Sequence, residues 1–181
     1  MERERYIEDD VLSLSEFIGT ADNEACWHCW RDEDTQRGYN HRMTSTLAEF
    51  TNGGITTGGF HATIIRKADG TPVGGIFLSE GAMPDLAIMI YPPHRRQGYA
   101  ARAFALGAAY CFDTFRMPRL YAGCYPHNDA SMKMLAKCGF LPHPAGNVAE
   151  KHYLTGEDIT QLDFWKENPA MPSLPTRNDD C

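Results

Sequence analysis

A short apolar run that stops at two prolines, with a glycine-containing turn and an alanine-rich segment after it, limits the possible folds more than any other part of this chain. Residues 85–91 have the composition of a strand, and Pro92-Pro93 should end it because proline cannot donate to a strand ladder. From Gln97 to about Phe115, small and apolar residues recur at helical spacing, which predicts a long helix that can pack closely on a sheet. The sequence thus predicts a strand, a turn and a helix in direct succession.

Other segments predict an α/β fold in which helices flank a mixed central sheet. Asp69-Gly70 separates two β-branched, apolar runs within residues 60–79, the pattern of a hairpin. Further strands are expected at residues 119–124, 139–143 and 151–154, and Asn128 should cap a helix that runs to about Lys137. Two or three short helices are expected in residues 11–50, and the glycines in residues 51–59 predict a flexible turn.

Length and charge restrict the class of protein. The 181 residues suit a single domain, expected over residues 1–166, with a flexible tail over residues 167–181. The charged N-terminus lacks the apolar run of a signal peptide, and no stretch has the ~20 apolar residues needed to span a membrane, so we expect a cytoplasmic protein. The net charge of −7 disfavours nucleic acid as the main partner and is compatible with an amine-bearing substrate. The sequence does not distinguish a monomer from a homodimer.

The turn before the long helix has the character of an anion site. It reads Arg95-Arg96-Gln97-Gly98-Tyr99-Ala100, and the free N–H groups and dipole of a helix start attract anions. Gly98 lets a phosphate approach the backbone, and the arginines add positive charge. No Gly-Lys-Ser/Thr follows and the G-x-G-x-x-G spacing is absent, which disfavours nucleotide hydrolysis and hydride transfer. A plain loop with two solvated arginines is the alternative.

Arg95-x-x-Gly98-x-Ala100 resembles the Q/R-x-x-G-x-G/A pattern with which GNAT N-acetyltransferases hold the pyrophosphate of acetyl-CoA. Residues 85–91 resemble the strand of that family that pairs with the pantetheine arm. Asn128-x-x-Ser131, followed by a helix and Gly139-Phe140, resembles the RimJ/RimL-like branch. The resemblance covers about residues 60–154 and implies the GNAT acyl-CoA N-acyltransferase fold, acetyl-CoA as co-substrate and no metal, with N-terminal helices that shape the acceptor site.

The resemblance also implies roles for individual residues. Ile90 and Tyr91 would lie against the acetyl and pantetheine groups, and Asn128 would bond the pantetheine, act as a helix cap, or do both. Lys133 would reach a phosphate or remain an exposed helical lysine. The residues implied around the pyrophosphate are Arg95, Arg96, Gln97, Gly98, Tyr99, Ala100 and Ala101, with Ser131 as a further cofactor contact.

The usual general acid of the family is missing from this sequence. The position seven residues after Asn128, often a tyrosine, is Leu135. Ser131 is the substitute that the resemblance suggests and Tyr125 is a second candidate, although Ser131 could equally be only a local partner of the cap. For the base, Glu80 and Asp85 flank the strand at 85–91, where burial can bring the pKa of a carboxyl toward neutrality. Both could be plain loop acids, and a chain of waters is an equal alternative.

Together these features predict an enzyme that transfers the acetyl group of acetyl-CoA to a primary amine, on a protein N-terminus or a small molecule, by direct attack in a ternary complex. The missing tyrosine leaves a second hypothesis open, an acetyl-CoA-binding sensor or structural module with little turnover. Cys26-x-x-Cys29 leaves a third, a thiol or zinc protein, although one such pair does not complete a four-ligand site. Trp27 and Trp30 are expected to pack inward or to line the acceptor pocket.

Overall fold

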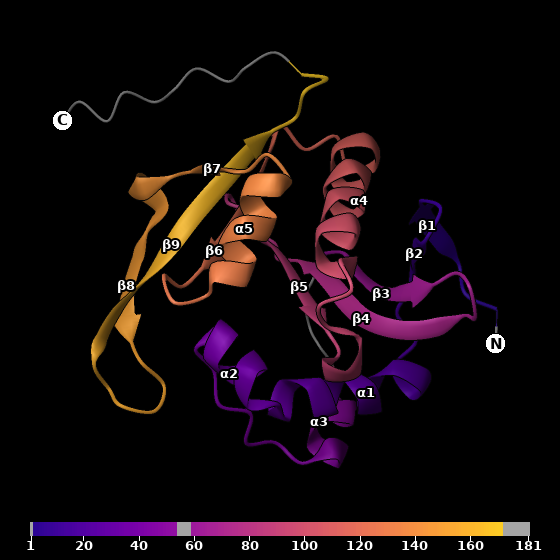
Figure 1. Cartoon of the computed structure of the whole chain (residues 1–181), viewed down its shortest axis with the longest axis horizontal. Coiled ribbons are helices and arrows are strands. Elements are labelled where there is room, and N and C mark those ends of the chain that lie inside the picture. The colour runs from indigo at the N-terminus through magenta and orange to yellow at the C-terminus, as the bar shows by residue number, and fades with distance from the viewer. Residues whose placement is uncertain (1, 54–58, 172–181) are drawn as a thin grey trace.

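The structure is a computed structural model that describes residues 2–53 and 59–171, and it contains two sheets (Figure 1). The strands of the first sheet follow the chain order, each antiparallel to its neighbour: β1 (Arg5–Glu8), β2 (Leu12–Glu16), β3 (His61–Arg66), β4 (Thr71–Leu78) and β5 (Leu86–Ile90). The second sheet is also antiparallel and has the order β6 (Arg119–Cys124), β9 (Asp158–Glu167) and β7 (Leu141–Pro142), with β8 (Val148–Lys151) paired to the first residues of β9.

The two sheets join at one end only. Asp85, just before β5, forms a parallel bridge with Tyr121 of β6, and the Tyr121 N–H donates to the Pro84 carbonyl at 3.0 Å. From this contact β5 and β6 run in the same direction and separate toward Ile90 and Cys124, where the described residues contain no further bridge between them (Figure 1). The edge of β5 that faces β6 is therefore unpaired with any strand over most of its length.

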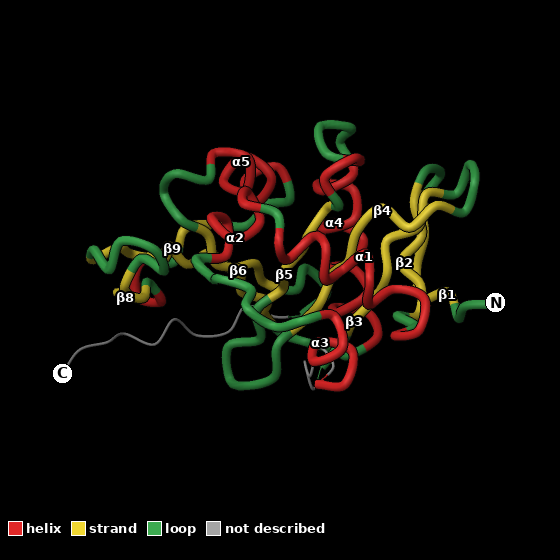
Figure 2. The backbone as a smooth tube through the Cα atoms, turned by 90° about the horizontal axis from the view of Figure 1, so that it is seen from below, coloured by secondary structure: helices red, strands yellow, loops and turns green. Residues whose placement is uncertain are grey.

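Helices cover both faces of the first sheet (Figure 2). On one face lie α1 (Gly19–Arg31), α2 (Glu33–Tyr39) and α3 (Leu47–Gly53), and Cys26 of α1 contacts Met89 of β5 at 3.8 Å. On the opposite face α4 (Tyr99–Thr114) packs so closely that a Cβ at Gly107 would overlap Ile76. The helix α5 (Asp129–Lys137) covers the second sheet through the fully buried Leu135. The two helical layers leave the junction of the sheets between them.

The predicted fold class is confirmed, and so are most elements in the middle of the chain. The hairpin in residues 60–79 is β3 and β4, the strand at 85–91 is β5, and the long helix is α4, which begins two residues later than expected. The strand at residues 119–124 and the helix capped by Asn128 also form as predicted. Of the flexible turn expected at residues 51–59, residues 51–53 end α3 and residues 54–58 lie outside the described residues.

The segment in which two or three short helices were expected, about residues 11–50, contains three helices but begins with a strand. This strand is β2, Leu12–Glu16, which is paired on both sides. Leu12 and Leu14 are fully buried on one face, and Ser13 and Ser15 are buried on the other, where their hydroxyls lie 3.2 Å apart. Because one hydroxyl donates to the other, both serines have a hydrogen-bond partner and this strand can be covered on both faces. The alternation of leucine and serine has the two-residue period of a strand.

The C-terminal strands also differ from expectation. The predicted strand at residues 139–143 is reduced to Leu141–Pro142, and the one at residues 151–154 is wrong because Val148–Lys151 is the strand and residues 153–155 form a turn. The longest strand, β9, was not predicted, and it ends at Glu167. Asn168 is buried and its Nδ2 donates to the Met117 carbonyl at 3.0 Å, so the first two residues of the expected tail belong to the fold. Over residues 2–53 and 59–171, no helix combines the length and apolar character needed to cross a bilayer.

Candidate functional site

The turn before α4 is open and rich in free donors. Gly98 occupies the N-cap position with φ of 78°, and Arg96 also has a positive φ, of 62°. Within the described part of the chain, the N–H groups of Arg96, Gln97 and Gly98 donate to no backbone carbonyl. A Cβ built on Gly98 would meet no atom within 4 Å. The turn therefore combines unpaired N–H groups, the positive end of a helix dipole and space beside the backbone, as an anion site requires.

The two arginines of this turn have different surroundings. Arg95 Nη1 pairs with Asp32 at 2.7 Å, its Nη2 donates to Thr35 Oγ1 at 2.6 Å, and its Nε donates to the Ile90 carbonyl at 3.1 Å. Desolvation favours the neutral form of Asp32, but hydrogen bonds from Arg95 and Thr35 outweigh it, so the pKa of Asp32 lies below its ordinary value. Arg96 is exposed. Arg95 thus joins α2 to the end of β5, and Arg96 is the arginine that the turn presents to solvent.

The open edge of β5 carries main-chain groups of alternate residues. The Tyr91 N–H donates to the Val73 carbonyl at 2.9 Å, so odd-numbered residues face β4 and Ile88 and Ile90 face the junction with β6. Consistent with this, Tyr39 of α2 donates its hydroxyl to the Ile88 carbonyl at 2.6 Å, and the Ile90 carbonyl accepts from the Arg95 guanidinium. The N–H groups of Ile88 and Ile90 therefore point along this edge as donors.

Tyr91, which the resemblance places with Ile90 against the acetyl and pantetheine groups, does not present its N–H to the open edge. Its side chain is buried with Cys26 and Met89 on the face covered by α1, and its N–H is used in the sheet. Of the two strand residues proposed from the sequence, the structure brings Ile90 alone to the open edge.

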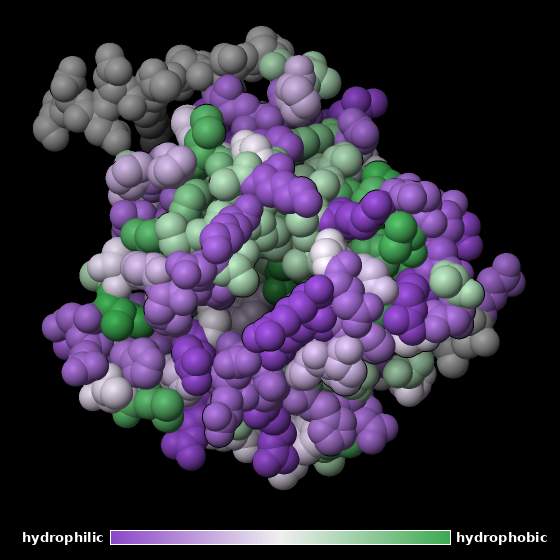
Figure 3. Space-filling model, in the orientation of Figure 1, coloured by the Kyte–Doolittle hydropathy of each residue, from purple (hydrophilic) through white to green (hydrophobic). Residues whose placement is uncertain are grey.

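The face drawn in Figure 3 is hollowed near its centre. Figure 1, in the same orientation, places β5 and the first turns of α4 and α5 around this position. Apolar residues form the floor of the hollow and hydrophilic residues its rim (Figure 3). A groove therefore lies beside the open edge of β5.

The start of α5 borders the same region. Asn128 Oδ1 accepts from the Ser131 N–H at 3.1 Å, which confirms Asn128 as an N-cap. Its Nδ2 lies 3.3 Å from the position of a Cβ at Gly38, so the amide faces α2. Ser131 is half-buried and Lys133 is exposed. Leu135, at the position where the resemblance implies a tyrosine, is fully buried and packs in the core.

Asp85 lies at the point where the sheets join, and its environment differs from that of Glu80. Burial raises the pKa of Asp85 from 3.8 to about 6, the charge of Asp163 adds to the rise, and the Gly123 N–H opposes it. Glu80 is exposed in the loop between β4 and β5. The carboxyl of Asp85, one of the two considered as a base, therefore has a pKa suited to accepting a proton near neutral pH.

Tyr125, the second candidate acid, is held in a network that ties α2 to β8. Its buried hydroxyl donates to Glu150 at 2.6 Å, and Asn40 Nδ2 donates to the other Glu150 oxygen at 2.9 Å. Desolvation and the bond to Glu150 both raise the pKa of Tyr125 above its ordinary range. The proton of this hydroxyl is therefore engaged by Glu150, which favours a role in joining the two elements.

The Cys26–Cys29 pair is buried in α1. Both thiols are free, and burial raises the pKa of Cys26 to about 12 and that of Cys29 in the same direction. A thiol held in its neutral form is a poor nucleophile and metal ligand. Among residues 2–53 and 59–171, no group of three or more His, Cys, Asp or Glu side chains is arranged to hold a metal. Trp27 and Trp30 pack in the cluster with these thiols.

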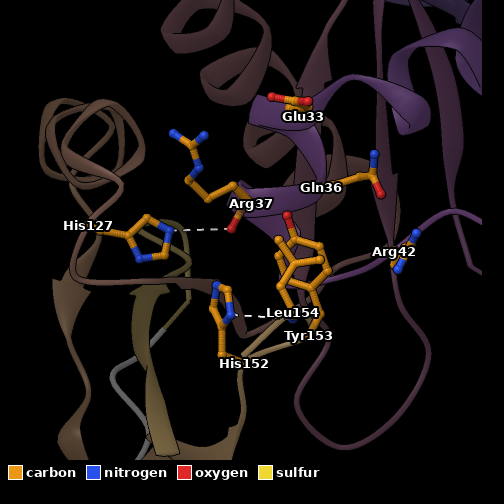
Figure 4. A pocket seen from close by; sticks show the side chains of 8 residues that line it. All are labelled: Glu33, Gln36, Arg37, Arg42, His127, His152, Tyr153 and Leu154. Carbon is orange, nitrogen blue, oxygen red and sulfur yellow. Dashed lines mark hydrogen bonds between the residues drawn. The ribbon is translucent and has the colours of Figure 1, made fainter. Parts of the chain in front are cut away.

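Two surface pockets lie near the hollow. The larger, of about 570 Å³, lies between α2 and the turn after β8 (Figure 4). Its lining includes Glu33, Gln36 and Arg37 of α2, the helix whose Tyr39 hydroxyl donates to the Ile88 carbonyl of β5. The smaller, of about 370 Å³, lies between α4 and α5 beside Ala101 and Lys137. The larger pocket is lined by Glu33, Gln36, Arg37, Arg42, His127, His152, Tyr153 and Leu154.

Sequence reasoning did not find Tyr39, Glu150, His143 or Asp163. Each lies in a segment without a recognisable motif, and each acquires its partner from a strand or helix distant in the chain. Their roles depend on tertiary contacts, which no local pattern encodes.

Comparison with known proteins identifies relatives of this architecture. The acetyltransferase (GNAT) domain family matches residues 5–141. An acetyltransferase (GNAT family) from Bacillus anthracis has a TM-score of 0.75 at 20% identity over 90% of this chain and 98% of that one. Spermidine N-acetyltransferase from Vibrio cholerae, solved with CoA and spermine, has a TM-score of 0.76 at 14% identity over 88% and 97%. Ribosomal-protein-S5-alanine acetyltransferase from Vibrio fischeri has a TM-score of 0.74 at 16% identity over 92% and 98%. No curated protein matches the chain.

Proposed function

Since the chain belongs to the GNAT acetyltransferase family, we propose that it transfers the acetyl group of acetyl-CoA to a primary amine by direct attack. The observation that carries this proposal is the open turn at Gly98, which is joined by the 3-10 helix at Pro92–His94 to a strand whose edge is free. A pyrophosphate needs several donors and little steric bulk, and the N–H groups of residues 96–98 with the exposed Arg96 supply both. The residues present therefore fit the co-substrate.

Arg96, Gln97, Gly98, Tyr99 and Ala100 hold the pyrophosphate in this proposal, and Ile90 and Asn128 line the groove that takes the pantetheine arm. Arg95 does not bind the pyrophosphate in this proposal, because its guanidinium is already bound by Asp32 and Thr35. Its role is to hold α2 beside the site. The pocket beside Ala101 and Lys137 is positioned to take the nucleotide end. Lys133, exposed on the first turns of α5, adds positive charge.

When bound, acetyl-CoA supplies an acetyl group joined to sulfur as a thioester. An amine at neutral pH is largely an ammonium, so the Asp85 carboxylate first takes one proton from it, directly or through water. One N–H group of the open edge of β5, that of Ile88 or that of Ile90, stabilises the negative charge that develops on the carbonyl oxygen. As the N–C bond forms and the C–S bond breaks, the nitrogen loses its second proton and the Ser131 hydroxyl protonates the thiolate. The lost proton restores the hydroxyl through water.

Replacing Ser131 with alanine tests the assigned proton donor. We expect kcat to fall by about 10- to 100-fold. This loss is smaller than the full contribution of a general acid because water can protonate the thiolate instead. The affinity for acetyl-CoA should change by less than about twofold. The helix start should persist because the backbone N–H of Ser131, not its hydroxyl, bonds to Asn128. Ser131→Thr keeps a hydroxyl and should retain most turnover. Equal kcat for the alanine variant and the natural protein would remove Ser131 from the mechanism.

The neighbouring arginines provide a matched pair of variants. Arg95→Met should lower the free energy of unfolding by about 1–3 kcal/mol, because Asp32 and Thr35 lose a charged partner, as urea titration would show. Arg96→Met should change stability by less than about 0.5 kcal/mol. It should instead weaken acetyl-CoA binding roughly fivefold, as calorimetry would show. If Arg95→Met weakened binding alone and Arg96→Met lowered stability alone, the two roles would have to be exchanged.

The acceptor that this site favours is the α-amine of a peptide, as in the RimJ/RimL-like branch. The pocket beside α2 carries Arg37 and Arg42 against a single carboxylate, Glu33, so it should repel a polyamine. Release of free thiol from acetyl-CoA, measured with N-terminal peptides and with spermidine, tests the function and its acceptor together. Tight binding of acetyl-CoA without thiol release for any amine would favour the second candidate, a sensor, which Leu135 in place of the tyrosine supports.

A further inference from the structure

A hydrogen-bonded pair of ionisable side chains, His143 and Asp163, lies at the junction of the sheets, outside the groove beside β5. His143 Nδ1 and Asp163 Oδ2 are 2.6 Å apart, and Asp163 is only 9% exposed. Neither residue lies on α4, α5 or the edge of β5, so neither holds the co-substrate in the proposed function. An imidazole bonded to a buried carboxyl needs a reason for its place.

The pair is held rigidly. The His143 ring stacks on Trp165 with centroids 5.1 Å apart and 18° between the planes, and the main-chain N–H of His143 donates to the Asp163 carbonyl at 2.8 Å. The Asp163 N–H donates to Asn147 Oδ1 at 2.9 Å. A Cβ at Gly146, in the 3-10 helix η2 (Pro144–Gly146), would overlap the Asp163 carboxylate, so only glycine allows this approach. The geometry is fixed from three directions.

The register of the strands brings this pair next to Asp85. Asp163 of β9 lies opposite Gly123 of β6, and Asp85 bridges to Tyr121, two residues before Gly123 on the same face. Gly123 has no side chain, and the uncharged amide of Gln161 occupies the space beside its Cα. The charge of Asp163 accordingly contributes to the raised pKa of Asp85.

Few other ionisable groups of the described chain face this cluster. From α2, Tyr39 lies close enough for Asp85 to raise its pKa, after the larger effect of its burial, so the phenol stays neutral. From β6, the ring of Tyr121 lies 5.7 Å from that of His143, and Arg119 stacks on Trp165 while pairing with Glu167 at 2.6 Å. Asp163 is therefore the charge that acts on Asp85, and His143 is the group that can neutralise it.

Resting on the proposed acetyl transfer, we propose that His143 and Asp163 are a positioning pair that sets the proton affinity of the Asp85 carboxylate and hence the pH range of turnover. With His143 protonated the pair is neutral overall, and with His143 neutral it carries one negative charge. That charge disfavours ionisation of Asp85 and makes it a stronger base. The imidazole thus adjusts the base without touching the substrate.

Two variants of nearly unchanged shape distinguish an effect on the proton affinity of Asp85 from structural support of the loop that carries His143. Asp163→Asn removes the negative charge, so the acidic limb of the kcat/KM profile should move to lower pH by roughly one unit. His143→Asn keeps a donor to Asp163 but removes the ring that can carry a positive charge beside it, so the limb should move to higher pH. If the pair only supported the loop, both variants would shift the acidic limb of the kcat/KM profile in the same direction. This result would overturn the proposal.

A direct titration makes the test independent of turnover. Carbon-13 NMR of the aspartate carboxyls, with Asp85→Asn to assign the signal, should show the pKa of Asp85 lowered by Asp163→Asn and raised by His143→Asn. These opposite shifts in a protein that acetylates no amine would refute the proposed function and leave the pair's role intact. Shifts below about 0.2 units in both variants, given the roughly one unit expected for a near charge, would overturn it. If Asp163→Asn does not fold, His143→Asn alone decides, since an unmoved or lowered Asp85 pKa contradicts the proposal.

Discussion

Replacing Gly98 with glutamate is expected to weaken acetyl-CoA binding by at least about 100-fold. Gly98 has a φ of 78° and borders open space, so the new side chain would extend into the volume where the pyrophosphate is proposed to bind. A carboxylate about 4 Å from a phosphate charge costs about 4 kcal/mol near a protein surface, and each 1.4 kcal/mol is a factor of ten in affinity. Isothermal calorimetry with acetyl-CoA measures the loss.

Gly70→Glu is the matched control for this variant. Gly70, in the turn between β3 and β4, has a φ of 71° and also has no atom within 4 Å of its Cβ position. The backbone strain and the added charge are therefore similar, while the location differs. We expect both variants to lose similar stability on thermal unfolding and Gly70→Glu to keep its affinity for acetyl-CoA. A folded Gly98→Glu protein that binds as tightly as the control would contradict the proposed pyrophosphate site.

Local patterns were sufficient for the part of the fold that carries the co-substrate. Pro92-Pro93 ends β5, Gly98 opens the turn, and Asn128 caps α5, and each is a signal contained within a few residues. The strand β9 had no such signal because its sequence mixes polar and apolar residues, and its polar Asp163 is buried only through a bond to His143. A strand stabilised by a distant partner cannot be found from its own composition.

In the candidate site, too, local sequence predicts some features and tertiary contacts determine the others. The sequence located the turn but treated Arg95 and Arg96 alike, and only the contacts with Asp32 and Thr35 separate them. It proposed both Glu80 and Asp85 as bases, because both flank one strand. Their difference arises from burial at the junction with β6, a strand that lies more than thirty residues later. Residue type and order predict the binding turn, whereas the proton chemistry depends on the packing of two sheets.

Replacing Asp85 with asparagine is expected to lower kcat/KM by about 100-fold or more near pH 7.5, the range found for removal of a general base. The natural protein should gain activity as the pH rises through about 6, where Asp85 loses its proton, and the variant should lack this limb. The deficit should shrink at high pH because the amine is then already deprotonated. Glu80→Gln is the control variant, because Glu80 is the other carboxyl considered as the base. If Glu80→Gln lowered kcat/KM more than Asp85→Asn does, Glu80 would be the base instead.

The same substitution should stabilise the fold above pH 6. Because the pKa of Asp85 is about 6 in the folded protein and 3.8 ordinarily, the folded state binds more protons than the unfolded state between these values. The free energy of unfolding should therefore decrease as the pH rises from about 4 to about 6, and stay at the lower level above it. Asp85→Asn removes this decrease, and we expect a gain of about 1–3 kcal/mol at pH 8, the upper value being the free energy of the full pKa shift. Higher stability with lost turnover is the result expected when a charged group is kept for its chemistry, and a variant that is both slow and destabilised would instead indicate that Asp85 supports the junction of the sheets.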